Sequence, residues 1–241
     1  MKHILFTFDV EEFDPPKKLG SSLKDNEEFK ISLEGLSSIL SLLSNYDIRA
    51  TFFVTSYFAK NNPKLIKKIN SRGHEIACHG YYHSDSYLKD LSKAGLAKQE
   101  IEGIIKNKIK GFRAPRFEIK DISSLSKFGF SYDSSIHPIF IPGRYNNFNK
   151  KRKVHKIGKI IEIPPSTLPI IRLPIFWLVF KNFGLNYAKI FTKVNFNFSD
   201  YTLLVFHPWE FANLGQIKIS RYIKSKYGQE LLNLLKRYIL F

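Results

Sequence analysis

The sequence predicts a single α/β domain in which strands and helices alternate, arranged either as a barrel or as a doubly wound sheet. A chain of 241 residues can bury one sizeable core, and 44% apolar residues indicate a packed fold. Short apolar runs alternate with segments of helical periodicity, which is typical of parallel βαβ units. Several polar residues follow the carboxyl ends of predicted strands, where both architectures place ligands. These residues indicate a functional site without deciding between the two architectures.

The first half of the chain supplies the clearest alternation. Residues 3–9 form an unbroken apolar run and predict a buried first strand. Apolar residues at helical spacing between residues 29 and 43 predict the first helix. A second helix is expected over residues 63–72, because proline suits a first turn and Gly73 directly follows the end. Further strands are predicted over residues 49–55, 75–79 and 111–114, and a third helix over residues 92–108.

The second half continues the pattern with shorter elements. We expect a short helix over residues 122–128, a longer one over 185–194 and a closing helix over 220–238. Strands are predicted over residues 130–133, 160–163 and 202–207, the last being strongly apolar. The domain is expected to span residues 1–241, with a basic, aromatic-rich insertion around residues 140–200.

Charge is unevenly distributed along the chain. The net charge is +17, yet residues 1–102 carry 14 basic and 14 acidic side chains, whereas residues 103–241 carry 24 and 7. A basic half favours anionic partners such as an acidic glycan, a lipid-phosphate-linked sugar or an anionic membrane surface. A general preference for lysine explains the excess equally well. The sequence contains no recognised nucleic-acid motif, so we expect no nucleic-acid partner.

Cysteine content and hydropathy bear on the cellular compartment. The single cysteine, Cys78, excludes an internal disulfide framework and fits a reducing compartment. The amino-terminal apolar run is followed at once by acidic residues, unlike a secretory signal. Residues 160–185 are interrupted by prolines and charges, which excludes an unbroken membrane-spanning helix there. We therefore expect a cytoplasmic protein with peripheral membrane contact through its basic half.

Two groups of side chains have the chemistry of a metal site. His79 and His83, in HGYYH, directly follow a predicted strand, and imidazoles four residues apart on a helical turn can hold one ion. Two unrelated surface histidines are the alternative. Asp9 and Glu11 follow the first strand and can serve as base and ligand, unless they belong to an ordinary acidic loop. Glu12 and Asp14 of the same segment are expected to face solvent.

Arg113 and His207 also stand at predicted strand ends. An arginine in GFRAPRF can hold a carboxylate in a fixed orientation, although a structural ion pair explains it equally. His207 ends the apolar strand of LLVFHPWEF, where it is either a core residue or a general acid. The other histidines lack comparable surroundings and are interpreted as structural; they are His3, His74, His137 and His155.

Four segments in this order resemble the polysaccharide deacetylase family, also called the NodB-homology domain. They are TFDVEEF at residues 7–13, HGYYH at 79–83, GFRAPRF at 111–117 and LLVFHPWEF at 203–211, and they span most of the chain. Together with YDSSI at residues 132–136 and EIPPSTL at 162–168, they are most similar to the exopolysaccharide-associated branch. The resemblance implies a deformed, incomplete (β/α)7-type barrel and a divalent ion, with Zn²⁺ expected.

The resemblance also implies roles for individual residues. It makes Asp9 the catalytic base, Arg113 the residue that orients this base, and His207 the general acid. It makes His79 and His83 metal ligands. Two positions depart from the commoner family pattern. Val10 stands where a second aspartate is usual, which leaves Glu11 as the expected carboxylate ligand and Glu12 as the fallback. Arg116 stands where an aromatic residue is usual, and its backbone N–H is expected to face an oxyanion.

The function implied by the resemblance is removal of N-acetyl or O-acetyl groups from a polysaccharide or a glycan biosynthetic intermediate. Besides Arg116, we expect Tyr82 and Trp209 to contact the carbohydrate substrate. Two alternatives come from other classes. One is an amidohydrolase acting on a small formamide or ureide, and the other is a barrel that binds glycans without catalysis. Metal content and acetate release before and after chelation separate these readings.

Overall fold

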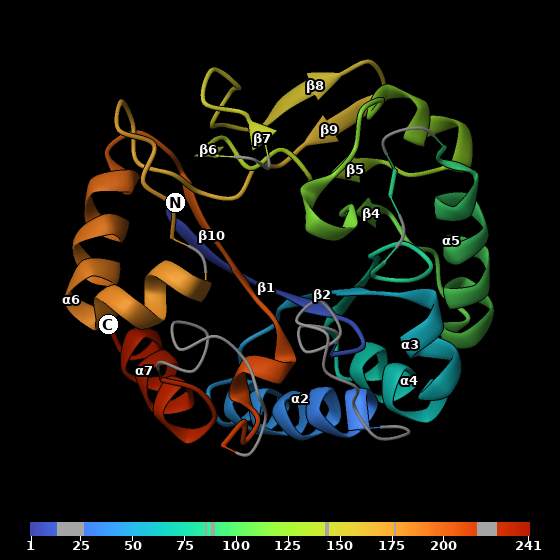
Figure 1. The fold of residues 1–241 in the computed structure, drawn as a ribbon, viewed down its shortest axis with the longest axis horizontal. Helices are drawn as coiled ribbons and strands as arrows, with labels where there is room; N and C mark the ends of the chain where they lie inside the picture. Colours follow the sequence, from blue (N-terminus) through green and yellow to red (C-terminus); the bar gives the residue numbers. More distant parts are fainter. Residues whose placement is uncertain (14–26, 85, 88–89, 143–144, 176, 216–225) are drawn as a thin grey trace.

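A curled, eight-stranded sheet forms the centre of the molecule (Figure 1). The computed structural model describes the whole chain except residues 14–26, 85, 88–89, 143–144, 176 and 216–225. The strand order is β10-β1-β2-β3-β4-β5-β9-β8; all neighbours are parallel except the antiparallel pair β8 and β9. Within the described residues, the edge strands β8 and β10 do not pair with each other. This arrangement confirms the expected deformed, incomplete barrel.

The strands of the barrel differ greatly in length. The longest, β1, alternates between a helix-facing side with Phe8 and Val10 and a barrel-facing side with Thr7 and Asp9. The bounds are β1 His3–Val10, β2 Thr51–Val54, β3 Glu75–Cys78, β4 Gly111–Phe112, β5 Tyr132–Asp133, β8 His155–Ile157, β9 Ile160–Glu162 and β10 Tyr201–Phe206, with a separate hairpin of β6 Phe140–Ile141 and β7 Tyr145–Asn146.

Helices cover the outside of the sheet (Figure 1). Apolar side chains on their inner faces join those of the strands in one main core. The described part of the chain also has three short 3₁₀ helices, which follow strands or connect them. The bounds are α2 Glu27–Asn45, α3 Ser56–Asn61, α4 Pro63–Ser71, α5 Ser92–Ile105, α6 Trp177–Phe196 and α7 Gln229–Ile239, with η1 Pro115–Phe117, η2 Ser123–Phe128 and η3 Pro208–Phe211.

Several predicted elements differ in extent from the observed ones. The predicted closing helix over residues 220–238 is wrong at its start, because Gly228 adopts φ 57° and ψ −128° and α7 begins only at Gln229; residues 220–225 lie outside the described part. Helix α6 is longer than predicted and changes direction at Gly184, whose φ is 77°. The short helix α3 was not expected; the Thr55 side chain caps it by accepting from the Phe58 N–H.

The barrel is open between its edge strands, β8 and β10. After β9 the chain returns beside β10, where the Ser166 N–H donates to the Leu203 carbonyl at 3.2 Å and the Leu203 N–H to the Ser166 hydroxyl at 2.9 Å. These contacts narrow the opening without adding a strand. None of the described helices is both long enough and apolar enough to cross a bilayer.

Candidate metal and active site

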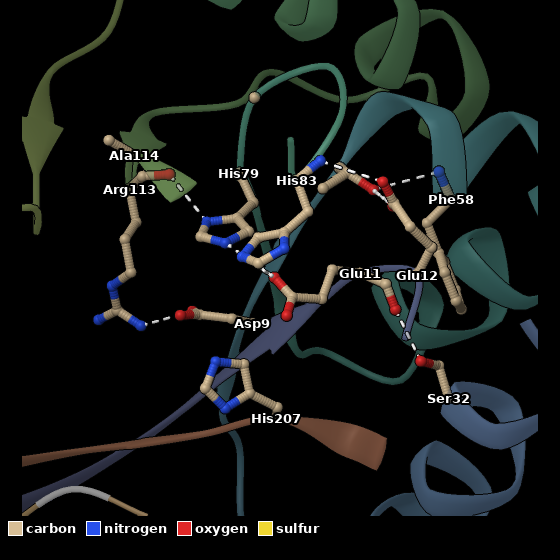
Figure 2. Close-up of polar contacts among 12 residues, drawn as sticks. Asp9, Glu11, Glu12, Ser32, Phe58, His79, His83, Arg113, Ala114 and His207 are labelled. Atoms are coloured by element: carbon tan, nitrogen blue, oxygen red, sulfur yellow. Dashed lines mark hydrogen bonds and ion pairs between the residues drawn. The ribbon is translucent and has the colours of Figure 1, made fainter. Parts of the chain in front are cut away.

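Asp9 is held at the carboxyl end of β1 by a buried ion pair. Its Oδ1 accepts from Arg113 Nη1 at 2.7 Å, and only 3% of Asp9 is exposed. Burial alone would raise the pKa of Asp9, but the charges of Arg113, His79 and His207 outweigh it and lower this pKa below its ordinary value. The side chain is therefore an ionised carboxylate with one oxygen fixed by the guanidinium (Figure 2).

Glu11, His79 and His83 converge beside Asp9. Glu11 directly follows β1, whereas the two histidines lie at the ends of the loop that follows β3. Glu11 Oε2 lies 3.3 Å from His79 Nε2 and 3.1 Å from His83 Nε2. The potential ligand atoms of the three residues all lie within 4.8 Å of one another, and all three side chains are buried. Figure 2 shows both imidazoles turned toward the Glu11 carboxylate.

The chemistry of these atoms fits a cation. His79 Nδ1 lies 2.9 Å from the Arg113 carbonyl and donates its proton there, which leaves the lone pair of Nε2 directed at Glu11. Apart from the two imidazoles, none of the described residues donates a hydrogen bond to the buried Glu11 Oε2. Acceptor atoms that face each other in a buried site repel unless a proton or a metal ion lies between them. Two imidazoles and one carboxylate are a ligand set that suits Zn²⁺ and leaves positions open.

Glu12 does not belong to this group of converging ligands. Its Oε1 accepts from the His83 N–H at 3.1 Å, and its Oε2 accepts from the Thr55 hydroxyl at 3.3 Å. Glu12 is only 7% exposed, so the expectation that it faces solvent is wrong: the carboxylate is used to anchor the loop that carries His83. Asp14, for which the same was expected, lies outside the described residues.

Arg113 is fixed on every side. It is fully buried, and Nη1 also donates to the Thr7 hydroxyl at 3.0 Å. Its Nε donates to the Ser134 carbonyl at 3.2 Å and its Nη2 to the Ser134 hydroxyl at 3.0 Å. The guanidinium lies 4.0 Å from the centre of the Phe53 ring. These contacts leave Arg113 one orientation, and that orientation determines where Asp9 points.

A buried acidic pair supports the segment behind Arg113. Asp133 and Glu162 are both fully buried, and burial together with the Asp133 carboxylate raises the pKa of Glu162 well above its ordinary range. The Ser135 hydroxyl donates to the Asp133 carboxylate at 2.7 Å. The oxygen of the same hydroxyl accepts from the Ala114 N–H at 2.8 Å. Sequence reasoning assigned no role to this pair; the only signal was its place in the YDSSI and EIPPSTL segments.

His207 approaches Asp9 from β10, the neighbouring strand of the sheet. Phe8 and Phe206 are register partners, so the next residues, Asp9 and His207, also lie side by side (Figure 2). His207 Nδ1 lies 2.7 Å from Glu210 Oε1. Burial lowers the pKa of His207, but the hydrogen bond to Glu210 and the charges of Glu11, Glu210 and Asp9 raise it to about 9. Glu210, which contacts the His207 imidazole, is a candidate site residue that sequence reasoning missed.

The expected substrate contacts fall in different surroundings. Trp209 is only 4% exposed and stacks on the His207 ring, with 5.2 Å between ring centroids. Tyr82 is 37% exposed and lies against Tyr57 and Tyr81, at 4.9 and 4.7 Å between ring centroids. The backbone of Arg116 adopts φ 57°. Residues other than glycine rarely take this conformation, and those that do cluster at functional sites.

A parallel barrel with a buried Glu-His-His group that could hold a metal ion, beside an arginine-held carboxylate, agrees with the comparisons with known proteins. The family profile for polysaccharide deacetylases matches residues 2–132, more than half of the chain, and the chain belongs to this family. A peptidoglycan deacetylase of Helicobacter pylori is 32% identical over 121 residues, which is 45% of this chain and 39% of that protein. The first four curated relatives are matched over 19% to 39% of their own lengths.

Solved structures share the fold over nearly the whole chain. A structure from Mycobacterium smegmatis, named as a polysaccharide deacetylase, has a TM-score of 0.68 at 20% identity and covers 99% of this chain and 82% of its own. The structure of PuuE allantoinase has a TM-score of 0.61 at 16% identity and covers 99% of this chain and 83% of its own. Both of these proteins therefore share their fold with this chain.

Proposed function

We propose that this chain is a metal-dependent hydrolase that removes N-acetyl groups from a carbohydrate substrate. The observation that carries the proposal is the convergence of Glu11, His79 and His83 on one point beside Asp9. Membership of the polysaccharide deacetylase family supports the reaction, and the carbohydrate is the substrate class that this family's name implies. Glu11, His79 and His83 would hold the ion, and the nitrogen and oxygen ligand set favours Zn²⁺.

The bound ion would supply Lewis-acid polarisation of the amide carbonyl and a lowered pKa of the attacking water. Asp9, oriented by Arg113, takes the proton of that water. The tetrahedral oxyanion that forms accepts a hydrogen bond from the Arg116 backbone N–H. His207 then donates its proton to the departing amine, which is a poor leaving group until it is protonated. Glu210 keeps His207 charged for this step.

One exposed aromatic ring on the loop between His79 and His83 supports a sugar as the substrate. Tyr82 presents part of its ring to solvent next to His83, and flat apolar faces suit the faces of sugar rings. We propose that Tyr82 contacts the sugar directly. Trp209 is assigned a more indirect task, because its buried ring supports the imidazole of His207.

The test is acetate release from acetylated amino-sugar oligomers before chelation, after chelation and after zinc is returned. We expect activity to disappear and then recover. His207→Ala should retain bound zinc and lose roughly 10²–10⁴ in rate, the range for one general acid. Full activity of His207→Ala would contradict its role, and activity unaffected by chelation would contradict the metal hydrolase.

An amidohydrolase acting on a small ureide is the second candidate function. The fold shared with PuuE allantoinase is the observation that favours it. Formamide and allantoin-like compounds belong in the same screen as the acetylated sugars. If they are turned over and the sugars are not, the reaction class stands and the substrate class is wrong.

A further inference from the structure

An apolar loop projects from the insertion between β9 and α6. In this tip loop, residues 168–173, the exposed fractions are 86% for Ile170, 59% for Ile171 and 45% for Leu173. The base of the loop is closed by a bridge between Thr167 and Pro174 and by a hydrogen bond of 2.8 Å from the Leu168 N–H to the Leu173 carbonyl. The apolar side chains are therefore held outward by a paired base.

The backbone of the tip loop is strained at two residues. Ile170 has φ 63° and Arg172 has φ 55°, both in the left-handed region. A β-branched residue such as isoleucine is a true outlier there, because its side chain crowds the backbone. Strain of this kind persists only where the surrounding structure imposes it, and it clusters at functional positions. Here the strained residue is also the most exposed apolar side chain of the loop, which suggests a task outside the folded domain.

A second loop places positive charge beside the tip loop. In this basic loop, residues 148–154, Lys150, Lys151 and Lys153 are exposed. Arg152 links the loops, because its Nε donates to the Thr167 carbonyl at 2.9 Å. The Arg172 guanidinium lies 5.7 Å from the centre of the Phe148 ring, which is itself 40% exposed. The two loops thus form one surface that combines protruding apolar side chains with lysines.

Acidic residues are few in the sequence around this surface; Asp200, which is exposed, pairs with Lys2 at 2.9 Å and also interacts with the charge of Lys153. Residues 140–199 contain eleven lysines and arginines and a single acidic residue, Glu162. Glu162 is fully buried and faces Asp133, so it contributes nothing to the surface. A partner for this region must therefore bring negative charge of its own.

We propose that the tip loop and the basic loop together dock the protein on an anionic lipid bilayer. Apolar side chains at a projecting tip can enter the interface between headgroups and acyl chains, while surrounding lysines bind the headgroups. A second copy of this chain would bring the same positive charge and be repelled. A soluble polyanion would satisfy the lysines but leave Ile170 and Ile171 in water. The inference does not depend on the proposed hydrolase activity.

The test is co-sedimentation of the full chain with vesicles of phosphatidylcholine alone or with roughly one third phosphatidylglycerol. The chain should bind only the anionic vesicles, and added salt should weaken the binding. Neutralising Lys150, Lys151 and Lys153 to glutamine should weaken binding on the order of 100-fold, at about fivefold for each lysine. The double variant Ile170→Ser/Ile171→Ser should lose at least about tenfold through lost apolar burial.

Matched controls come from the helices that follow β2 and β3. Leu96→Ser replaces an apolar side chain on α5 that is 48% exposed, and glutamine at Lys64, Lys67 and Lys68 on α4 removes three exposed lysines. Both controls should bind as the unaltered chain does, and all variants should keep its melting temperature. Absence of vesicle binding, equal binding to neutral vesicles, or equal loss in the controls would overturn the proposal. So would loss of dimerisation in Ile170→Ser/Ile171→Ser by light scattering, which would assign the surface to a second copy.

Discussion

The charge state of His207 is decided by its immediate neighbours. Its ordinary pKa would leave it mostly neutral above pH 7, and burial favours the neutral form further. Glu210 reverses this preference through a direct hydrogen bond of 2.7 Å, and the pKa rises to about 9. A cation on Glu11 would remove the contribution of that carboxylate, and its own positive charge would favour the neutral imidazole, whereas the Glu210 contact would stay intact. Glu210 is therefore the neighbour that favours the imidazolium form, which a proton donor needs.

Replacing Glu210 with glutamine should move the alkaline limb of the pH–rate profile. The raised pKa keeps the active imidazolium present below the limb, and activity falls as the pH rises through this pKa. Without the carboxylate, the limb should shift downward by roughly one to two pH units, the equivalent of a hydrogen bond to a charged group. The measurement is kcat against pH with the metal-loaded protein. Asp121→Asn, an exposed carboxylate change, is the control, and a limb that stays in place in Glu210→Gln would contradict this account.

Sequence reasoning at the residue scale identified polar side chains at strand ends that the structure brings close together. Asp9 is the penultimate residue of β1, His79, Arg113 and His207 each directly follow a strand, and the parallel register brings all four to one end of the barrel. It failed for Glu12, because the contact with the His83 N–H depends on the path of a loop that no periodicity specifies.

The contact between α2 and η3 fixes His207 at the scale of whole elements. Gly35 on α2 faces the first turn of η3, and a Cβ atom at this position would lie 1.7 Å from the Pro208 carbonyl oxygen. The backbones can approach so closely only because residue 35 lacks a side chain. Since Pro208 directly follows His207, this approach positions the imidazole as well as the two elements.

Gly35→Ala should therefore destabilise the protein and reduce activity together. Overpacking costs about 1–3 kcal/mol, which exceeds the roughly 0.5–1 kcal/mol that alanine gains over glycine in a helix. Gly103→Ala on α5 is the matched control, because in the described part of the chain no neighbouring group lies within 4 Å of its added Cβ. Denaturant unfolding should show a loss for Gly35→Ala and a small gain for Gly103→Ala. A stabilised, fully active Gly35→Ala would show that α2 and η3 do not need this close approach.

At the scale of the molecule, alternation along the chain predicted parallel strands, but not the way in which the sheet curls. The incomplete barrel was expected from the resemblance, since strand ends carry ligands in open sheets as well. The insertion was predicted least completely. Its strands β6, β7 and β8 have only two or three residues each, too few for a period of two to be recognised. Their existence depends on pairing partners that the sequence does not identify.

The proposed ion joins parts of the chain that are distant in sequence, so its binding should stabilise the whole fold. Glu11 follows β1, while His79 and His83 flank the loop after β3. Zinc at about 100 times its dissociation constant should add roughly 2.7 kcal/mol, which for a domain of this size raises the melting temperature by about 5–10 °C. Glu11→Gln should abolish most of this increase.

Glu12→Gln should keep the metal site with about 10–100-fold weaker zinc binding, because Glu12 only anchors the His83 loop. Calorimetric melting with and without zinc measures both variants. A full zinc response in Glu11→Gln, together with none in Glu12→Gln, would exchange the two roles and make Glu12 the ligand.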